Sequence, residues 1–191
     1  MNALVGVATS FGLSAAAGLN AYLPLLIVAL MARFTDLIAL QPPYDVLTSW
    51  WAIGILAVLA LIEAVVDKVP AVDSVNDVIQ TAIRPAAGAV LFASNANLIG
   101  EMHPAVALAC GLLIAGGVHA AKATVRPVVT GATAGLLNPV VSFVEDVVAV
   151  ITTVLAIVVP LFLVLLILLV MGFVLWWWRR RGTRAKKAPI E

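Results

Sequence analysis

The run that decides the fold class lies close to the C-terminus. Residues 147–178 read VVAVITTVLAIVVPLFLVLLILLVMGFVLWWW and contain no charged side chain. A helix that crosses the ~30 Å hydrocarbon layer of a membrane needs about 20 residues, and this run would form a helix about 48 Å long. We therefore predict a long membrane helix that kinks at Pro160, tilts, or projects beyond the bilayer.

The composition of the whole chain agrees with a membrane protein. Of the 191 residues, 63% are apolar and only 11% are charged, whereas soluble domains are roughly half apolar and about a quarter charged. This composition excludes a soluble enzyme, a nucleic-acid-binding domain and a disulfide scaffold. The single cysteine, Cys110, cannot form a disulfide within one chain. The charged residues that remain must lie within or beside lipid.

Three further regions reach or approach the length of a membrane helix. They are residues 3–32, which Gly18-Leu19-Asn20 and Pro24 interrupt, residues 50–66, and residues 104–121, which begin with proline and close at Lys122. Two other stretches, residues 71–97 and 123–146, are too polar for ordinary spans and too apolar for ordinary loops. We predict that each is a pair of short helices with a break, at Arg84-Pro85 in the first stretch and at Arg126-Pro127 and Gly135–Asn138 in the second. Such broken helices are of the re-entrant kind that commonly lines a site.

The fold predicted from these runs is all-α. It is a polytopic helical membrane domain over residues 1–178, with broken or re-entrant short helices and a long Pro-kinked C-terminal helix. Residues 179–191 form a basic tail that we predict to be disordered. Six of the eleven Lys and Arg residues follow Trp178, and basic residues next to a tryptophan belt are held on the cytoplasmic side. The C-terminus is therefore expected to be cytoplasmic.

Charged side chains recur at four-residue spacing beside the proline and glycine breaks. Glu63 and Asp67 are four apart, as are Lys122 and Arg126, with His119 one turn earlier. On a helix this spacing places side chains on one face. An ion that faces lipid alone costs several kcal/mol, so these groups must pair with one another or meet water.

From this pattern we predict a charged cavity between the broken helices, and its excess of carboxylates favours a cation or a proton over an anion. The candidate ion-binding or proton-relay residues are Asn20, Glu63, Asp67, Asp73, Asp77, Asn138, Glu145 and Asp146, and the candidate charge-balancing residues are Lys68, Arg84, His119, Lys122 and Arg126. The alternative interpretation is that the same groups form ion pairs that fasten the short helices together.

Enzyme signatures are missing from the sequence. There is no Glu-x-x-His or His-Glu-x-x-His pattern, no Gly-x-Ser-x-Gly elbow and no phosphate-binding glycine loop. We therefore assign no catalytic residue, metal ligand or cofactor. Small residues are better placed for helix packing: Ser14 and Gly18, Ala107 and Gly111, and Gly131 and Gly135 are each four apart, a spacing that lets helix backbones approach closely.

The order of the polar motifs also carries a resemblance. The matching segments are Gly18–Pro24, Glu63 with Asp67–Pro70, Asp73, Asp77, Arg84–Ala89, His119, Lys122, Arg126, Gly135–Ser142 and Glu145-Asp146. Together they resemble the bacterial membrane family described as domain of unknown function 4126, over about residues 5–155, with the terminal helix outside the pattern. The resemblance implies an all-helical protein of the bacterial inner membrane, and it brings no activity.

Three functions stay open at this point. The first is a small transporter or channel whose charged cavity binds a cation or relays protons. The second is a structural or assembly protein with a closed network of ion pairs, and the third is a lipid-handling protein such as a flippase. The expected partners are membrane lipid and a small solute, cation or proton, with no nucleic acid. A homo-oligomer is also open, because no sequence feature decides it.

Overall fold

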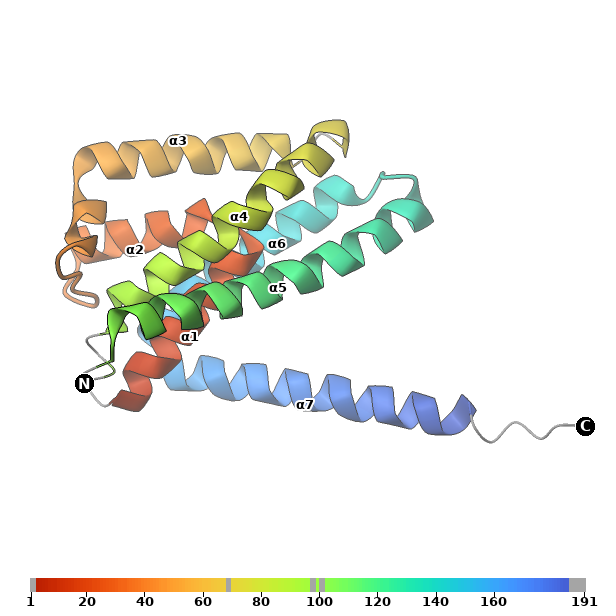
Figure 1. The fold of residues 1–191 in the computed structure, drawn as a ribbon. Helices are drawn as coiled ribbons and strands as arrows, with labels where there is room; N and C mark the ends of the chain where they lie inside the picture. The colour runs from red at the N-terminus through yellow and green to blue at the C-terminus, as the bar shows by residue number, and fades with distance from the viewer. Residues whose placement is uncertain (1–2, 68–69, 97–98, 100–101, 186–191) are drawn as a thin grey trace, which may run out of the picture.

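The computed structural model describes residues 3–67, 70–96, 99 and 102–185, and every long element in this part of the chain is a helix (Figure 1). In chain order the elements are α1 (Ala3–Leu19), α2 (Tyr22–Phe34), the short 3-10 helix η1 (Tyr44–Thr48), α3 (Trp50–Val66), α4 (Pro70–Ser94), α5 (Pro104–Thr133), α6 (Asn138–Val158) and α7 (Pro160–Ala185). The prediction of an all-α fold is confirmed.

The predicted interruption of the first apolar run is present between α1 and α2. Asn20 follows the last residue of α1, and its side-chain Oδ1 accepts hydrogen bonds from the backbone N–H groups of Tyr22 and Leu23, at 3.1 and 2.9 Å. The first N–H groups of a helix have no partner within the helix, and an asparagine oxygen supplies one. Asn20 therefore stabilises the start of α2 directly after α1 ends.

The two stretches predicted as broken helices contain fewer breaks than expected. Helix α4 continues through Pro85, and α5 continues through Pro127, past the predicted end at Lys122, to Thr133. An internal proline costs a helix roughly 3 kcal/mol, but α4 and α5 pack against each other more extensively than any other pair, and this packing offsets the cost. The predicted breaks at Arg84-Pro85 and Arg126-Pro127 were therefore wrong.

The predicted break at Gly135–Asn138 is present, where glycine permits it. Ala134 and Gly135 have φ angles of 51° and 79°, in the left-handed region, and this conformation ends α5 as is common at helix C-termini. At Pro160, where a kinked helix was predicted, α6 ends at Val158 and α7 begins at Pro160. Figure 1 shows α6 and α7 running apart from this point, so the proline separates two helices and does not merely bend one.

Helix α1 is the central helix, because it packs against α4, α5, α6 and α7. Small residues allow its closest contacts: a Cβ added to Gly18 would lie 2.5 Å from the Ala115 carbonyl oxygen, and one added to Gly88 would overlap the Ala115 Cβ. Gly111 is equally close to the Gly88 backbone. The pairs that begin at Ser14 and Ala107 therefore lie at tight contacts, as predicted. The pair at Gly131 does not, because a Cβ there would meet nothing within 4 Å.

The distribution of polarity is unlike that of a soluble protein. Helices α5 and α6 are each long and apolar enough to cross a membrane, which suggests membrane association. Large apolar side chains are exposed along α3, α5, α6 and α7, whereas the interior contains alanine, serine and several charged groups. Helix α7 continues to Ala185, so the first part of the predicted tail is helical. Residues 186–191 lie outside the described residues.

Candidate functional site

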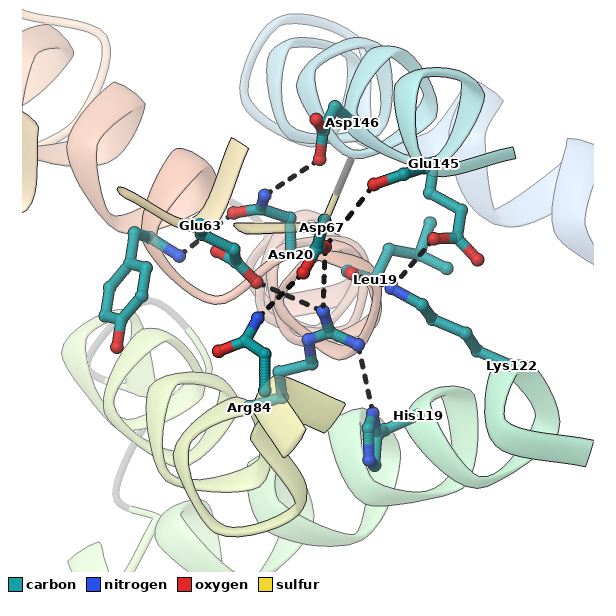
Figure 2. A network of polar contacts seen from close by, with 12 residues as sticks. Leu19, Asn20, Glu63, Asp67, Arg84, His119, Lys122, Glu145 and Asp146 are labelled. Carbon is teal, nitrogen blue, oxygen red and sulfur yellow. Dashed lines mark hydrogen bonds and ion pairs between the residues drawn. The ribbon is translucent and has the colours of Figure 1, made fainter. Parts of the chain in front are cut away.

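Most of the predicted site residues converge at the break between α1 and α2. Figure 2 shows these side chains around the end of α1, contributed by α3, α4, α5 and α6. We call the following set the polar network: Asn20, Glu63, Asp67, Arg84, His119, Lys122, Arg126, Glu145 and Asp146. They lie far apart in the sequence, and only the packing of the helices brings them together.

Arg84 of α4 bridges the two carboxylates at the end of α3. Its Nη2 lies 3.1 Å from Glu63 Oε1 and 3.7 Å from Asp67 Oδ2. The side chains of Arg84 and Glu63 are 0% exposed, and that of Asp67 is 2% exposed. The four-residue spacing of Glu63 and Asp67 therefore places both carboxylates on one buried face, as predicted. A buried charge is tolerated only when it is paired in this way.

Asp67 also receives hydrogen bonds from residues that the sequence analysis did not identify. The Asn76 Nδ2 donates to Asp67 Oδ1 at 2.7 Å, and the Ser142 hydroxyl donates to Asp67 Oδ2 at 3.4 Å. Arg126 Nη2 lies 3.9 Å from the same Oδ2. Asn76 and Ser142 are ordinary polar residues with no motif of their own. Only their positions, one turn before Gln80 on α4 and one turn after Asn138 on α6, could have indicated them.

His119 connects α5 to α4, and its contacts assign its protonation state. The Arg84 Nη1 lies 3.2 Å from His119 Nδ1, and Thr81 Oγ1 lies 3.1 Å from His119 Nε2. A guanidinium can only donate, so Nδ1 accepts and carries no proton. The ring proton is on Nε2, which faces the Thr81 hydroxyl, and His119 is therefore neutral in this arrangement.

Lys122 joins the C-terminal end of α1 to α6. Its Nζ lies 2.8 Å from Glu145 Oε2 and donates to the backbone carbonyl of Leu19 at 3.3 Å. The last carbonyls of a helix are unpaired and carry partial negative charge, so a cation is favourable at this position. Arg126 Nη2 lies 3.4 Å from the same Glu145 oxygen. His119, Lys122 and Arg126 are all buried on one face of α5, as their spacing predicted.

Asn20 connects the helix break to α6 as well as starting α2. Its Nδ2 donates to Asp146 Oδ1 at 2.9 Å, while its Oδ1 accepts from the first turn of α2. One side chain therefore joins the start of a half-helix to a carboxylate of the network. The prediction that Asn20 and Asp146 lie at the same site agrees with this contact, and their role in binding remains a prediction.

The other predicted residues do not join the described contacts of the network. Asn138 Oδ1 accepts from the Thr130 hydroxyl at 3.0 Å, near the turn between α5 and α6. Lys68 lies outside the described residues, and the side chains of Asp73 and Asp77 on α4 also lie outside what the structure describes. The structure therefore brings together nine of the thirteen predicted residues and leaves the placement of three side chains open.

Two buried oxygen atoms in this region have no hydrogen-bond partner among the described residues. They are Glu63 Oε2 and Gln80 Oε1. Gln80 is 2% exposed and lies four residues before Arg84, so both side chains project from one face of α4. The sequence analysis missed Gln80, although that spacing was a usable signal. Within the described residues no group of three or more His, Cys, Asp or Glu side chains is arranged to hold a metal ion.

Comparison with known proteins identifies a family and no function. A family model described as Domain of unknown function (DUF4126) matches residues 7–180. This range extends beyond the predicted limit near residue 155 and contains most of α7, so the prediction that the terminal helix lies outside the family pattern was wrong. No match was found among curated proteins or among solved structures.

Proposed function

The chain belongs to the DUF4126 family of unknown function, and from that premise we propose that it is a small membrane transporter or channel. The polar network is its ion site, and the coupled or conducted species is a proton or a cation. The protein is proposed to lie in the bacterial inner membrane with its C-terminus in the cytoplasm, where Arg179–Arg181 would remain after the tryptophans of α7.

The arrangement of polarity supports the membrane location. In a bilayer the outer surface of a helical protein must be apolar, and ionisable side chains face the interior of the bundle, where they mark ion or proton pathways. Exposed leucine, valine and isoleucine side chains cover α3, α5 and α6, while Arg84 is 0% exposed. A soluble protein of this size would have the opposite arrangement.

The observation that carries the transport proposal is the position of the network at a helix break. Lys122 meets the C-terminal end of α1, and Asn20, which also donates to Asp146, meets the N-terminal end of α2. Secondary transporters commonly bind their ions at the ends of such discontinuous helices, where free carbonyl and N–H groups meet charged side chains. Ion pairs that span four helices can also exchange partners, which would let the helices move relative to one another.

The test is flux into proteoliposomes containing the purified protein. We expect the wild type to carry protons or a monovalent cation faster than empty vesicles do, and Asp67→Asn and Glu145→Gln to lose most of this flux. Asp36→Asn is the matched control, because Asp36 is exposed and outside the network. If no selective flux of protons, common ions or small solutes is measured, or if the two network variants behave like the control, the proposal is wrong.

A second candidate function is that of a structural or assembly protein. The observation that favours it is that the charged groups form ion pairs with one another. Lys122 and Arg126 both pair with Glu145, and Arg84 pairs with Glu63 and Asp67. In this case charge neutralisation would lower stability, no flux would be observed, and a partner would co-purify from native membranes with wild-type protein. Measuring flux and stability on the same variants separates the two functions.

A lipid-handling function has weaker support. An apolar groove of about 490 Å³ lies between α1, α5, α6 and α7, with Phe11, Leu113 and Met171 among its lining residues. It fits an acyl chain better than a headgroup. Headgroup chemistry would require basic side chains open to lipid, whereas Arg84 is 0% exposed and Arg126 is 7% exposed.

A further inference from the structure

The charges of the polar network do not balance among the side chains that the structure describes. Four carboxylates, those of Glu63, Asp67, Glu145 and Asp146, face three permanent cations, those of Arg84, Lys122 and Arg126. A buried charge without compensation is costly, and such a group usually becomes neutral instead. One additional positive charge, a proton or a cation, would balance the set.

His119 does not supply this charge. Its Nδ1 accepts from Arg84 Nη1 at 3.2 Å, and a second ring proton on Nδ1 would place an N–H against a guanidinium N–H. Two donors cannot form a hydrogen bond. Among the side chains that the structure describes, the remaining candidates for an additional proton are the four carboxyl groups, and their contacts differ.

Three of the carboxylates are surrounded by donors or are open to solvent. Both oxygens of Asp67 accept hydrogen bonds, from Asn76 and Ser142. Glu145 Oε2 meets Lys122 and Arg126, and its side chain is 15% exposed. Asp146 accepts from Asn20 and is only half-buried. Each of these three carboxylates therefore has hydrogen-bond donors or cations beside it, or is partly open to solvent.

Glu63 differs from the other three. Its side chain is 0% exposed, its Oε1 accepts from Arg84 at 3.1 Å, and its Oε2 has no donor. A protonated carboxyl group matches this arrangement, because its carbonyl oxygen accepts from arginine while its hydroxyl needs an acceptor. Gln80 Oε1, which also has no partner among the described residues, lies on the same face of α4 as Arg84 and can be that acceptor.

We propose that Glu63 is the proton-binding residue of the network and carries its proton on Oε2, directed to Gln80. The proton comes from hydronium in the aqueous phase: one O–H bond of hydronium breaks, leaving water, as the O–H bond of the carboxyl group forms, and release of the proton to water reverses the step. Among the described residues, the titratable groups that interact electrostatically with Glu63 are Arg84 of α4, Asp67 at the end of α3, Lys122 of α5 and Tyr22 of α2. This inference rests on the proposed transport function, for which it identifies the proton as the ion.

Infrared difference spectroscopy tests the inference without any measurement of flux. Spectra of the reconstituted full-length protein are recorded between acid and alkaline pH, in H2O and in D2O. We expect a carbonyl stretching band of a buried protonated carboxyl group that shifts in D2O and is lost in Glu63→Gln. The band should remain in Glu145→Gln and should shift in Gln80→Leu, which removes the acceptor and keeps the carboxyl group.

Stability provides a second measurement with an opposite expectation for two neighbouring carboxylates. Glutamine has the shape and hydrogen-bonding pattern of protonated glutamate, so Glu63→Gln should keep the melting temperature of the wild type. Asp67→Asn should lower it by roughly 5–10 °C. Absence of the band, a band unaffected by Glu63→Gln, or equal losses of stability in both variants would overturn the proposal.

Sodium distinguishes the remaining source of positive charge. If Glu63 Oε2 and Gln80 Oε1 bind a monovalent cation, sodium should raise the melting temperature of the wild type and not that of Glu63→Gln, and this result would overturn the proton assignment. Absence of flux together with the expected infrared band would instead contradict the transport function and leave the protonation of Glu63 standing. The two proposals therefore fail separately.

Discussion

Two neighbouring regions of α4 and α5 can be compared. One is the contact of small residues between these helices, the other is the polar network, and different forces stabilise the two. Gly88 and Ala115 make the close backbone contact, and one turn away Arg84 and His119 interact through long side chains. At the contact of small residues, van der Waals packing decides how closely the two helices approach each other. In the polar network, this fixed separation of α4 and α5 brings buried charged side chains within hydrogen-bonding distance of one another. The comparison indicates that the apolar contact positions the polar site.

The largest expected effect is on the polar side of this comparison. Arg84→Met removes the cation that meets Glu63 and Asp67, and leaving a buried carboxylate without its partner costs about 3–5 kcal/mol. Unfolding in mixed detergent micelles measures the loss. Arg84→Lys, which keeps one positive charge, should lose less. A free energy of unfolding unchanged in Arg84→Met would mean that the network does not hold α3 to α4.

A smaller effect is expected on the apolar side. In Gly88→Ala the new methyl group would overlap Ala115 and come within 2.9 Å of the Gly111 carbonyl oxygen, and overpacking typically costs about 1–3 kcal/mol. Gly117→Ala on α5 is the matched control, because a Cβ there meets nothing within 4 Å. The same micelle unfolding compares them, and equal stabilities would contradict the close contact.

Infrared spectra of Gly88→Ala sharpen the comparison further. If the small-residue contact positions the polar site, this variant should also change the carboxyl band assigned to Glu63, although Gly88 itself has no charge. Gly117→Ala should leave the band as in the wild type. A loss of stability without any change in the band would show that the two regions act independently.

The smallest effect is expected at the helix break. Asn20→Ala removes the acceptor for the N–H groups of Tyr22 and Leu23 and the donor to Asp146, and loss of such an acceptor costs about 1 kcal/mol. Asn20→Asp keeps the acceptor but places a carboxylate opposite Asp146. Unfolding at neutral and acid pH separates the contributions, because the Asp variant should recover stability as the carboxylates become protonated. A pH-independent Asp variant would argue that the Asp146 contact contributes nothing.

Several parts of the fold could be predicted from local sequence. Helix α3 has the predicted bounds because apolar residues continue without interruption up to Asp67, and the breaks at Asn20 and Pro160 follow from residues that favour helix ends. The prolines at positions 85 and 127 misled the prediction. A proline weakens a helix locally, but the extensive contact of α4 with α5 compensates, and no local pattern reports such a contact.

In the candidate site, too, some features could be predicted from local sequence and others depend on contacts between helices. The spacing of Glu63 with Asp67, and of Lys122 with Arg126, indicated which side chains share a helix face, because helical periodicity is a local property. Which charges pair across helices was not readable, and Gln80, Asn76 and Ser142 were missed because an uncharged polar residue has many ordinary uses.

The sequence by itself determined that the chain is helical and apolar, that its helices are interrupted at Asn20, Gly135–Asn138 and Pro160, and which charged residues share a face. These properties depend on composition and on the periodicity of short segments. Only the tertiary structure decided that the charges close around the end of α1, that His119 accepts from Arg84, and that Glu63 has a buried oxygen without a donor. Those facts depend on helix separations set by backbone contacts between residues far apart in the chain, such as Gly88 and Gly111.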